Sequence, residues 1–191
     1  MQTERTEIQY LILGHLARDV QPNGFNLGGT VAYAGRTAHA MGREVGIVTA
    51  CQQDIDLSAL QGLSVECSPS EHTTTFENRY EAAGRIQILR ARAGSLRLQN
   101  VPLAWHGASL VHFAPIIDEL DPACLQSFPN ATRCITPQGW LRTWQEEGRI
   151  ALQDWQALRP LLVHADVMVM SIEDLKGDEH AANALAAHCP V

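Results

Sequence analysis

The residues with the clearest chemical potential lie between the first apolar run and the first helical pattern. Asp19 follows the apolar run by a few residues, and a loop containing Asn26 leads from it to a glycine pair, Gly28 and Gly29. A carboxylate accepts hydrogen bonds from two adjacent hydroxyl groups, which is what a polyol presents. Glycines let the backbone approach a ligand because no Cβ intervenes. The pattern indicates a polyol site, with a solvated or capping Asp19 and a plain helix-entry turn at the glycines as the alternatives.

The elements that must position these residues form a βαβ unit. Residues 8–15 (IQYLILGH) are an apolar run typical of a buried parallel strand, and residues 44–51 are a second one. Between them, residues 28–41 carry apolar side chains at helical spacing, and Gly42 stands where a C-cap glycine would. Ligands of open α/β sheets bind at the carboxyl ends of the strands, so Asp19 lies in the expected zone.

The middle of the chain predicts an antiparallel hairpin. Residues 73–80 (TTTFENRY) and 85–91 (RIQILRA) alternate in character and are separated by a short turn. A hairpin of this kind in an α/β chain forms a lid over a site or, alternatively, an antiparallel edge of the main sheet.

Alternating strands and helices resume after the hairpin. Strand-like runs occupy residues 109–115, 133–137 and 167–171, and helical patterns occupy residues 121–128, 153–162 and 178–188. We therefore expect an α/β fold, doubly wound, with a mostly parallel sheet and a small β-hairpin lid at about residues 72–92. Because the last two residues look like the start of another strand, we expect residues 1–191 to form one incomplete domain whose C-terminal part is missing; a frayed terminus is the alternative.

Composition excludes several classes of protein. The net charge of −7 is not offset by any cluster of Lys or Arg, which argues against a nucleic-acid partner. The N-terminus is not a signal peptide, and no apolar run approaches the roughly 20 residues that cross a bilayer, so we expect no membrane association. Five cysteines without a CxxC pair or zinc spacing predict unpaired, mostly buried thiols and a reducing, cytoplasmic location. The histidines show no metal-binding spacing, and His112 is expected to be a satisfied core residue, as Trp140 is expected to pack at a strand end.

The segment GGTVAYAGRTAHAMGREVGIVTACQQD resembles the first signature of the ribokinase-like, PfkB-type carbohydrate kinases. Asp19 matches the acceptor of substrate hydroxyls in that family, and the hairpin matches the lid strands that cover the sugar. The run VMVMSIEDL resembles a strand ending in an Asn-x-x-Glu motif, which puts Ser171 at the Asn position and Asp174 at the Glu position. The stretches TTTFENRY and TPQGWLR look closest to the inositol-kinase-like branch.

The resemblance implies a kinase that uses ATP and Mg²⁺ to phosphorylate a hydroxyl of a sugar or cyclitol, with a possible homodimer through the lid. It implies that Ser171 and Asp174 organise the metal and phosphate. The substrate site that it implies comprises Asp19, Asn26, Gly28, Gly29, Tyr33, Glu77, Arg79 and Gln138.

Four departures from the family pattern change what is expected. Tyr33 stands near the place of a family Asn, and residues 51–54 (CQQD) lack the usual glycine before the Asp. Residues 136–142 (TPQGWLR) replace an Asp-x-Asn-x-Arg stretch, although Gln138 and Arg142 can still donate to a ligand. The family's Gly-Ala-Gly-Asp stretch, which holds the transferred phosphate and the catalytic Asp, does not occur in residues 1–191.

We therefore expect no catalytic residue in this chain, a catalytic Asp beyond Val191, and a fragment that is inactive alone. Two alternatives remain open. One is a non-catalytic polyol-binding module of the same fold. The other is a Rossmann-type dinucleotide protein, which the missing GxGxxG motif and the early hairpin disfavour.

Overall fold

The computed structural model describes residues 7–82 and 84–189, and a parallel sheet of six strands forms the centre of this part of the chain. The strand order is β12-β9-β8-β1-β4-β5, and each neighbouring pair is parallel. The strands are β1 (Tyr10–Leu13), β4 (Val45–Cys51), β5 (Ser64–Pro69), β8 (Leu110–Phe113), β9 (Thr132–Ile135) and β12 (Val167–Met168). Since β4 and β8 lie on opposite sides of β1, the topology switches between β1 and β8, where a crevice opens at the carboxyl ends.

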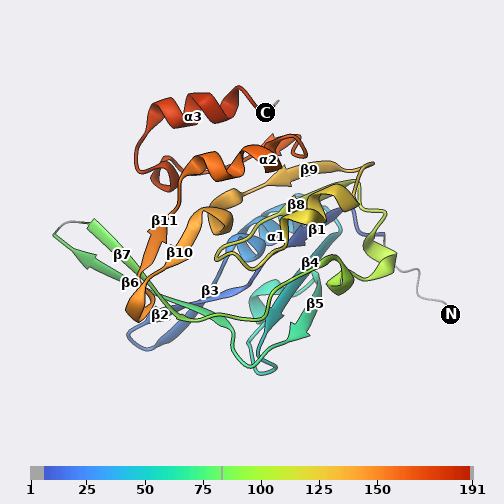
Figure 1. Ribbon diagram of the computed structural model, residues 1–191. Helices are drawn as coiled ribbons and strands as arrows, with labels where there is room; N and C mark the ends of the chain where they lie inside the picture. Colours follow the sequence, from blue (N-terminus) through green and yellow to red (C-terminus); the bar gives the residue numbers. More distant parts are fainter. Residues whose placement is uncertain (1–6, 83, 190–191) are drawn as a thin grey trace.

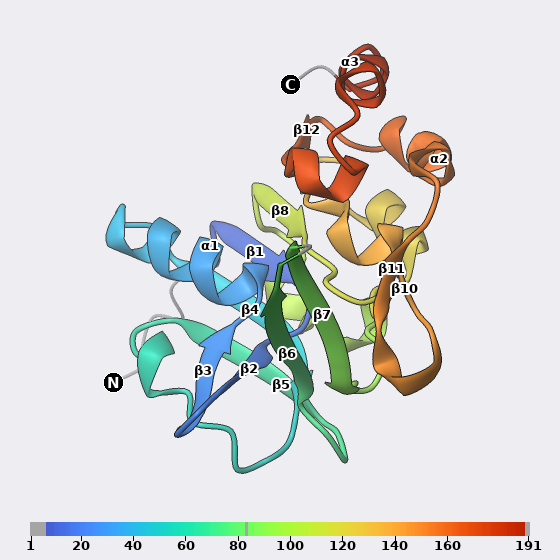
Figure 2. The same ribbon diagram turned by 90° about the vertical axis from the view of Figure 1, so that its left-hand side faces the viewer.

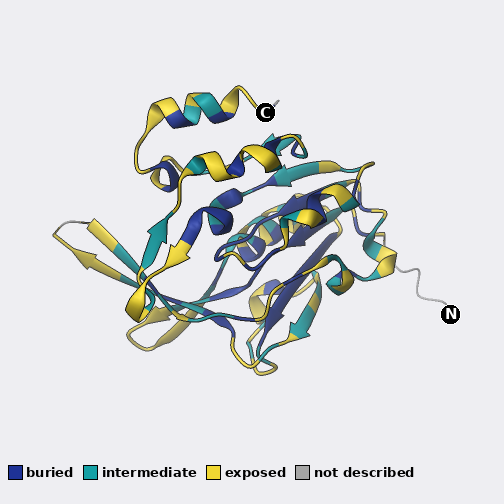
Figure 3. Ribbon diagram, viewed as in Figure 1, coloured by how far each residue is buried: buried dark blue, intermediate teal, exposed yellow. Residues whose placement is uncertain are grey.

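Both faces of this sheet are packed, and Figure 3 shows its central strands β1, β4 and β8 as mostly buried. Successive side chains of β1 alternate between two apolar clusters, with Leu11 and Leu13 in one and Ile12 in the other. Helix α1 (Thr30–Ala40) covers the Ile12 face, and the predicted C-cap Gly42 follows it with φ 78°. Helices α2 (Arg159–Leu162) and α3 (Glu179–Ala186) cover the other face.

The helical pattern predicted at residues 121–128 is a 3₁₀ helix, and the one predicted at residues 153–162 is partly 3₁₀. Pro122 begins the first and Pro129 follows its end, which confines it to Pro122–Ser127. The 3₁₀ helices are Ser58–Leu60, Leu98–Asn100, Leu103–Trp105, Pro122–Ser127, Pro137–Leu141, Glu146–Gly148, Trp155–Leu158 and Ile172–Leu175.

A second sheet, which we call the lid sheet, has the order β3-β2-β6-β7 and projects from one end of the molecule (Figure 1). Its strands are β2 (Ala17–Gln21), β3 (Gly24–Gly28), β6 (Thr74–Glu81) and β7 (Gly84–Ala91). The predicted β6–β7 hairpin is confirmed, and the alternative of an edge of the main sheet is wrong because β6 pairs with β2 instead. The loop predicted after the first strand is also wrong, since residues 17–28 fold into the β2–β3 hairpin around Gly24.

A further hairpin that the sequence did not predict, β10 (Arg142–Trp144) and β11 (Ile150–Leu152), lies beside β7 (Figure 2). Ile88 of β7 bridges Arg149, and Gly148 permits the approach, because a Cβ there would lie 2.1 Å from the Leu89 carbonyl oxygen. This contact joins the lid sheet to the second half of the chain.

The expected roles of two core residues are confirmed. The His112 ring is hydrogen-bonded on both sides, to the Tyr10 hydroxyl at 2.7 Å and to Thr136 Oγ1 at 2.8 Å, and burial lowers the pKa of His112 to about 4. Trp140 is buried, and its Nε1 donates to the Leu120 carbonyl at 2.8 Å.

The expectation of unpaired cysteines is wrong for one pair. Cys51 at the end of β4 and Cys67 on β5 form a disulfide, because the parallel pairing brings the two strands side by side with a Cα–Cα distance of 6.2 Å. Cys124 and Cys134 carry free thiols. The helices of the described residues are all too short or too polar to cross a bilayer.

Candidate functional site

A pocket of about 250 Å³ lies between the lid sheet and the crevice at the carboxyl ends of β1 and β8. We call it the lid pocket. It is lined by Ala17, Asp19, Gly29, Thr30, Tyr33, Phe76, Asn78, Arg85, Gln87, Ile116, Gln138 and Arg142. Four segments that are far apart in the sequence therefore meet at the topological switch point, where open α/β sheets bind ligands.

Asp19 projects from β2 into this pocket, and Gly28 makes room for its carboxylate. A Cβ at Gly28 would lie 2.3 Å from Asp19 Oδ2, so no larger residue fits beneath the carboxylate as it stands. Burial raises the pKa of Asp19 above its ordinary value, and the positive charge of Arg85 partly opposes that rise. Asn26 pairs with Asp19 in the β2–β3 register, but it is exposed and does not line the pocket.

Gly29 shapes the entry of α1 at the edge of the pocket. Its φ is 91°, and a Cβ would lie 2.5 Å from the His15 carbonyl oxygen, so both conformation and space require glycine. Tyr33, one turn into the helix, borders the pocket although 59% of its surface is exposed. The structure thus brings Asp19, Gly28, Gly29 and Tyr33 together, as the sequence predicts.

The lid strands present a different face from the one expected. Strand alternation turns Phe76 and Asn78 of β6 into the pocket. The side chains of Glu77 and Arg79 project from the opposite face of the lid sheet, where the Glu77 carboxylate binds Arg79 and Arg90. The structure therefore does not place Glu77 and Arg79 with the other candidate residues.

Two amide side chains of the lid hairpin line the pocket in their place. Gln87 of β7 donates through Nε2 to Asn78 Oδ1 at 3.1 Å. Both amides carry donors and acceptors suited to hydroxyl groups. The alternation along β6 could have identified Asn78, because residues two apart in a strand share a face and Asn78 lies two residues after the apolar Phe76.

Arg142 lies where the lid pocket meets a second cavity. Only 7% of Arg142 is exposed, its Nη1 donates to the Ile116 carbonyl at 3.2 Å, and its guanidinium lies 5.9 Å from the centre of the Phe76 ring. Its buried Nε has no hydrogen-bond partner among the described residues. Burial lowers the pKa of Arg142 to about 10, although nearby Asp174 favours the charged form. An unpaired buried donor on a charged group is costly, and a ligand oxygen would satisfy it.

The second cavity, which we call the arginine pocket, has a volume of about 580 Å³. It shares Arg85, Gln87 and Arg142 with the lid pocket and adds Arg149. Its full lining is Tyr80, Arg85, Ile86, Gln87, Arg142, Arg149, Ile150, Leu152, Glu173 and Asp174. Three guanidinium groups around one cavity suit an anion with several oxygens, because arginine donates bidentate hydrogen bonds to phosphate.

The structure also brings Gln138, Ser171 and Asp174 together. Asp174 is buried, its Oδ1 accepts from Gln138 Nε2 at 3.3 Å, and its Oδ2 accepts from the Ser171 backbone at 3.2 Å. The Ser171 hydroxyl accepts in turn from the backbone of Glu173, which completes a capping box at Ile172–Leu175. Asp174 therefore caps a short helix at the wall of the arginine pocket.

These residues do not form a magnesium cage. Both carboxylate oxygens of Asp174 are engaged by protein donors, and Glu173 forms an ion pair with Arg85 at 3.3 Å. The described part of the chain holds no group of three His, Cys, Asp or Glu residues arranged for a metal. Any magnesium here would need ligands from elsewhere, such as phosphate oxygens and water.

Glu119 holds the backbone beside the lid pocket in place, and no motif in the sequence predicted this role. Its buried carboxylate accepts from the backbone nitrogens of His15 and Ile116 at 2.9 Å and of Ile117 at 2.7 Å. It thus ties the end of β1 to the segment after β8. Since the Ile116 carbonyl accepts from Arg142, Glu119 also fixes the position of that guanidinium.

No family model and no curated protein matches this sequence. Solved structures do match. A pyrophosphate-dependent kinase in the ribokinase family, complexed with a pyrophosphate analogue and myo-inositol, aligns with a TM-score of 0.78 at 20% identity, covering 94% of this chain and 70% of that one.

Two fructokinases also match. The fructokinase of Halothermothrix orenii aligns with a TM-score of 0.64 at 13% identity, covering 96% of this chain and 77% of that one. The fructokinase of Xylella fastidiosa aligns with a TM-score of 0.60 at 16% identity, covering 95% of this chain and 67% of that one. The chain therefore has the ribokinase-like α/β fold, which confirms the predicted fold class. The neighbours with this fold include a pyrophosphate-dependent myo-inositol kinase.

Proposed function

We propose that this chain carries the substrate site of a kinase that phosphorylates a hydroxyl group of a sugar or cyclitol. The observation that carries the proposal is the junction of two pockets at Arg142. On one side, Asp19 offers a carboxylate for hydroxyl groups; on the other, arginines surround a cavity suited to a polyanion. Kinases of sugars and of myo-inositol share the fold, which supports the same reading.

The side chains divide the work by chemistry. Asp19 accepts hydrogen bonds from substrate hydroxyls, while Asn78 and Gln87 read further hydroxyls from the lid. Arg142 donates to the phosphate at the junction, and Arg85 and Arg149 neutralise the remaining charge. Phosphoryl transfer depends on positioning and charge stabilisation, which these groups supply.

The phosphate donor is ATP or pyrophosphate, bound with Mg²⁺ that arrives with it. The pyrophosphate-dependent neighbour and the arginine lining favour pyrophosphate, whereas the family resemblance favours ATP. The base that deprotonates the substrate hydroxyl is not among the residues named here. We propose that it comes from a part of the fold that residues 1–191 do not include.

Residues 1–191 then act as one incomplete domain with the lid over its substrate. The outer face of the lid sheet carries Val20 and Phe25, which pair in the β2–β3 register and are exposed. This apolar pair supports dimerisation through the lid. A monomer in sedimentation experiments at high protein concentration would exclude it.

A non-catalytic polyol-binding module is the second candidate, because the Gly-Ala-Gly-Asp stretch is missing from these residues. Isothermal titration of the chain with myo-inositol and ribose, with and without pyrophosphate, tests the shared part of both proposals. Phosphate transfer to myo-inositol by the longest natural form, followed by ³¹P NMR with ATP·Mg²⁺ and with pyrophosphate·Mg²⁺, separates them. Binding without transfer establishes the binding module, and absence of any polyol binding rejects both.

A further inference from the structure

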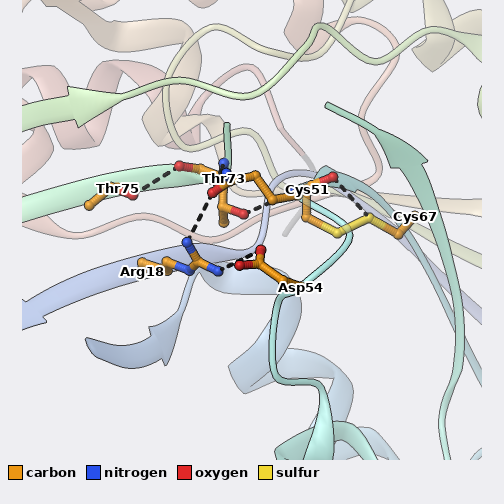
Figure 4. Close-up of polar contacts among 7 residues, drawn as sticks. Arg18, Cys51, Asp54, Cys67, Thr73 and Thr75 are labelled. Carbon is orange, nitrogen blue, oxygen red and sulfur yellow. Dashed lines mark hydrogen bonds and ion pairs between the residues drawn. A yellow bond between two sulfur atoms is a disulfide. The ribbon is translucent and has the colours of Figure 1, made fainter. Parts of the chain in front are cut away.

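The disulfide lies at the base of the lid sheet (Figure 4). Cys51 is the last residue of β4 and only 2% exposed, whereas Cys67 is partly exposed on β5, at the edge of the main sheet. The bond fastens this edge strand to β4 just before the chain leaves β5 for β6. It therefore anchors the connection that leads into the lid.

A hydrogen-bond network continues from the disulfide into that connection. The Cys51 carbonyl accepts from the Ser70 backbone at 3.0 Å. The next residue, Gln52, donates its backbone N–H to Thr73 Oγ1 at 3.0 Å, and its Oε1 accepts from Arg18 Nη1 at 2.9 Å. The Gln52 backbone thus binds Thr73, which precedes β6, and the Gln52 side chain binds Arg18 of β2.

The same network reaches the pocket wall. Arg18 precedes Asp19 on β2, and its Nη2 also forms an ion pair with Asp54 at 3.3 Å. Thr73 immediately precedes β6, which pairs with β2 at Asp19 and Phe76. Two of the three lid strands that carry pocket residues, β2 and β6, are therefore held near their starts by the segment that follows Cys51.

We propose that Cys51 and Cys67 form a thiol–disulfide exchange site whose oxidised state orders the lid and raises the affinity of the lid pocket for a polyol. The co-reactant is a low-molecular-weight thiol such as glutathione. Its thiolate attacks the sulfur of Cys67, the less buried of the two cysteines, and Cys51 leaves as a thiolate that takes up a proton. A second thiol then releases Cys67, so two protein thiols and one small disulfide replace the protein disulfide and two small thiols.

The affinity part of this proposal rests on the proposed polyol site, so the test reads the lid in two ways. Titration with myo-inositol is compared between the oxidised chain and the chain reduced with glutathione. Hydrogen exchange of the backbone amides in residues 74–81 is followed in the same two states without ligand. We expect reduction to weaken binding about fivefold or more and to speed exchange in β6.

Matched variants separate the bond from general effects of reduction. Cys67→Ser should bind and exchange like the reduced chain under both conditions. Cys134→Ser, which removes a free thiol on β9, should keep the full redox response.

The outcomes distinguish this proposal from the proposed function. Faster exchange on reduction, with no myo-inositol binding in either state, retains the redox site and rejects the polyol site. Equal exchange and equal affinity in the two states overturn the redox site. Alkylation of Cys51 and Cys67 without prior reduction, seen by intact mass, overturns it as well.

Discussion

Replacing Arg142 by methionine separates the effect of this buried guanidinium on protein stability from its effect on anion binding. Burial lowers the pKa of Arg142 to about 10, which corresponds to about 3 kcal/mol of destabilisation of the folded protein at neutral pH, since each pKa unit is worth about 1.4 kcal/mol. The substitution relieves this term but leaves the Ile116 carbonyl without its donor, which costs about 1–3 kcal/mol. We therefore expect the free energy of unfolding to change by less than about 2 kcal/mol in either direction.

The same substitution should sharply weaken anion binding. Removing one partner of a buried charge pair costs about 2 kcal/mol or more, which is about a 30-fold loss of affinity for pyrophosphate. Titration calorimetry measures that loss, and urea unfolding measures stability. The control is Arg149→Met, because Arg149 is exposed at the rim of the same pocket and should matter only a few-fold.

The pH dependence of stability checks the cost of burying this guanidinium, whatever its role. A cation whose pKa is lowered on folding destabilises the protein while it stays charged, and the penalty fades as the pH rises through the lowered value. The wild-type chain should therefore gain stability relative to Arg142→Met as the pH rises through about 10. A loss of 3 kcal/mol or more in the variant at neutral pH, with unchanged pyrophosphate affinity, would refute the reasoning and make Arg142 a structural residue.

The remaining predictions concern the two pockets. Gly28→Ala should abolish myo-inositol binding, because its Cβ displaces the Asp19 carboxylate, whereas Gly107→Ala, with 3.7 Å to its nearest neighbour, should bind normally in titration. Asp19→Asn should lower the affinity for myo-inositol about tenfold or more. At pH 7 it should nevertheless unfold at a higher urea concentration than the wild type, because burial raises the pKa of Asp19 and the ionised carboxylate therefore destabilises the folded protein. This gain in stability should vanish below about pH 4, where the carboxyl is protonated in both the folded and the unfolded state. Glu173→Gln should leave stability unchanged within about 1 kcal/mol but tighten pyrophosphate binding, because it frees Arg85 from an exposed ion pair; weaker binding by calorimetry would contradict this.

The sequence predicted the elements whose side chains have one clear period. The buried strands of the main sheet are continuous apolar runs, and α1 repeats small apolar residues at helical spacing between two capping glycines. The β2–β3 hairpin was not predicted, because residues 17–28 show neither a continuous apolar run nor helical spacing of apolar side chains. Their strand form depends on pairing with β6, a partner more than 50 residues away. The disulfide escaped for the same reason, since only strand order makes Cys51 and Cys67 neighbours.

In the lid pocket, the sequence predicted several residues of one local segment and missed two whose place depends on strand packing. Asp19, Gly28 and Gly29 lie within one short segment, whereas Asn78 and Gln87 depend on which face of the lid sheet turns inward. Neighbouring residues of a strand point to opposite faces, so taking the wrong face of β6 as the inner one puts Glu77 and Arg79 in the site in place of Asn78.

The buried groups of the two pockets share a physical logic that links fold to function. The chain is acidic overall, yet arginines gather where the lid sheet meets the β10–β11 hairpin, and the innermost of them, Arg142, keeps an unpaired donor. A purely structural position would favour an apolar side chain there, because a buried ion gives little net stability even when paired. An anion at the junction would change this balance, since it would satisfy Nε and neutralise the guanidinium in a place from which water is largely excluded. The energetic cost in the free protein and the expected strength of phosphate binding therefore have the same origin, which is the burial of Arg142 between the two pockets.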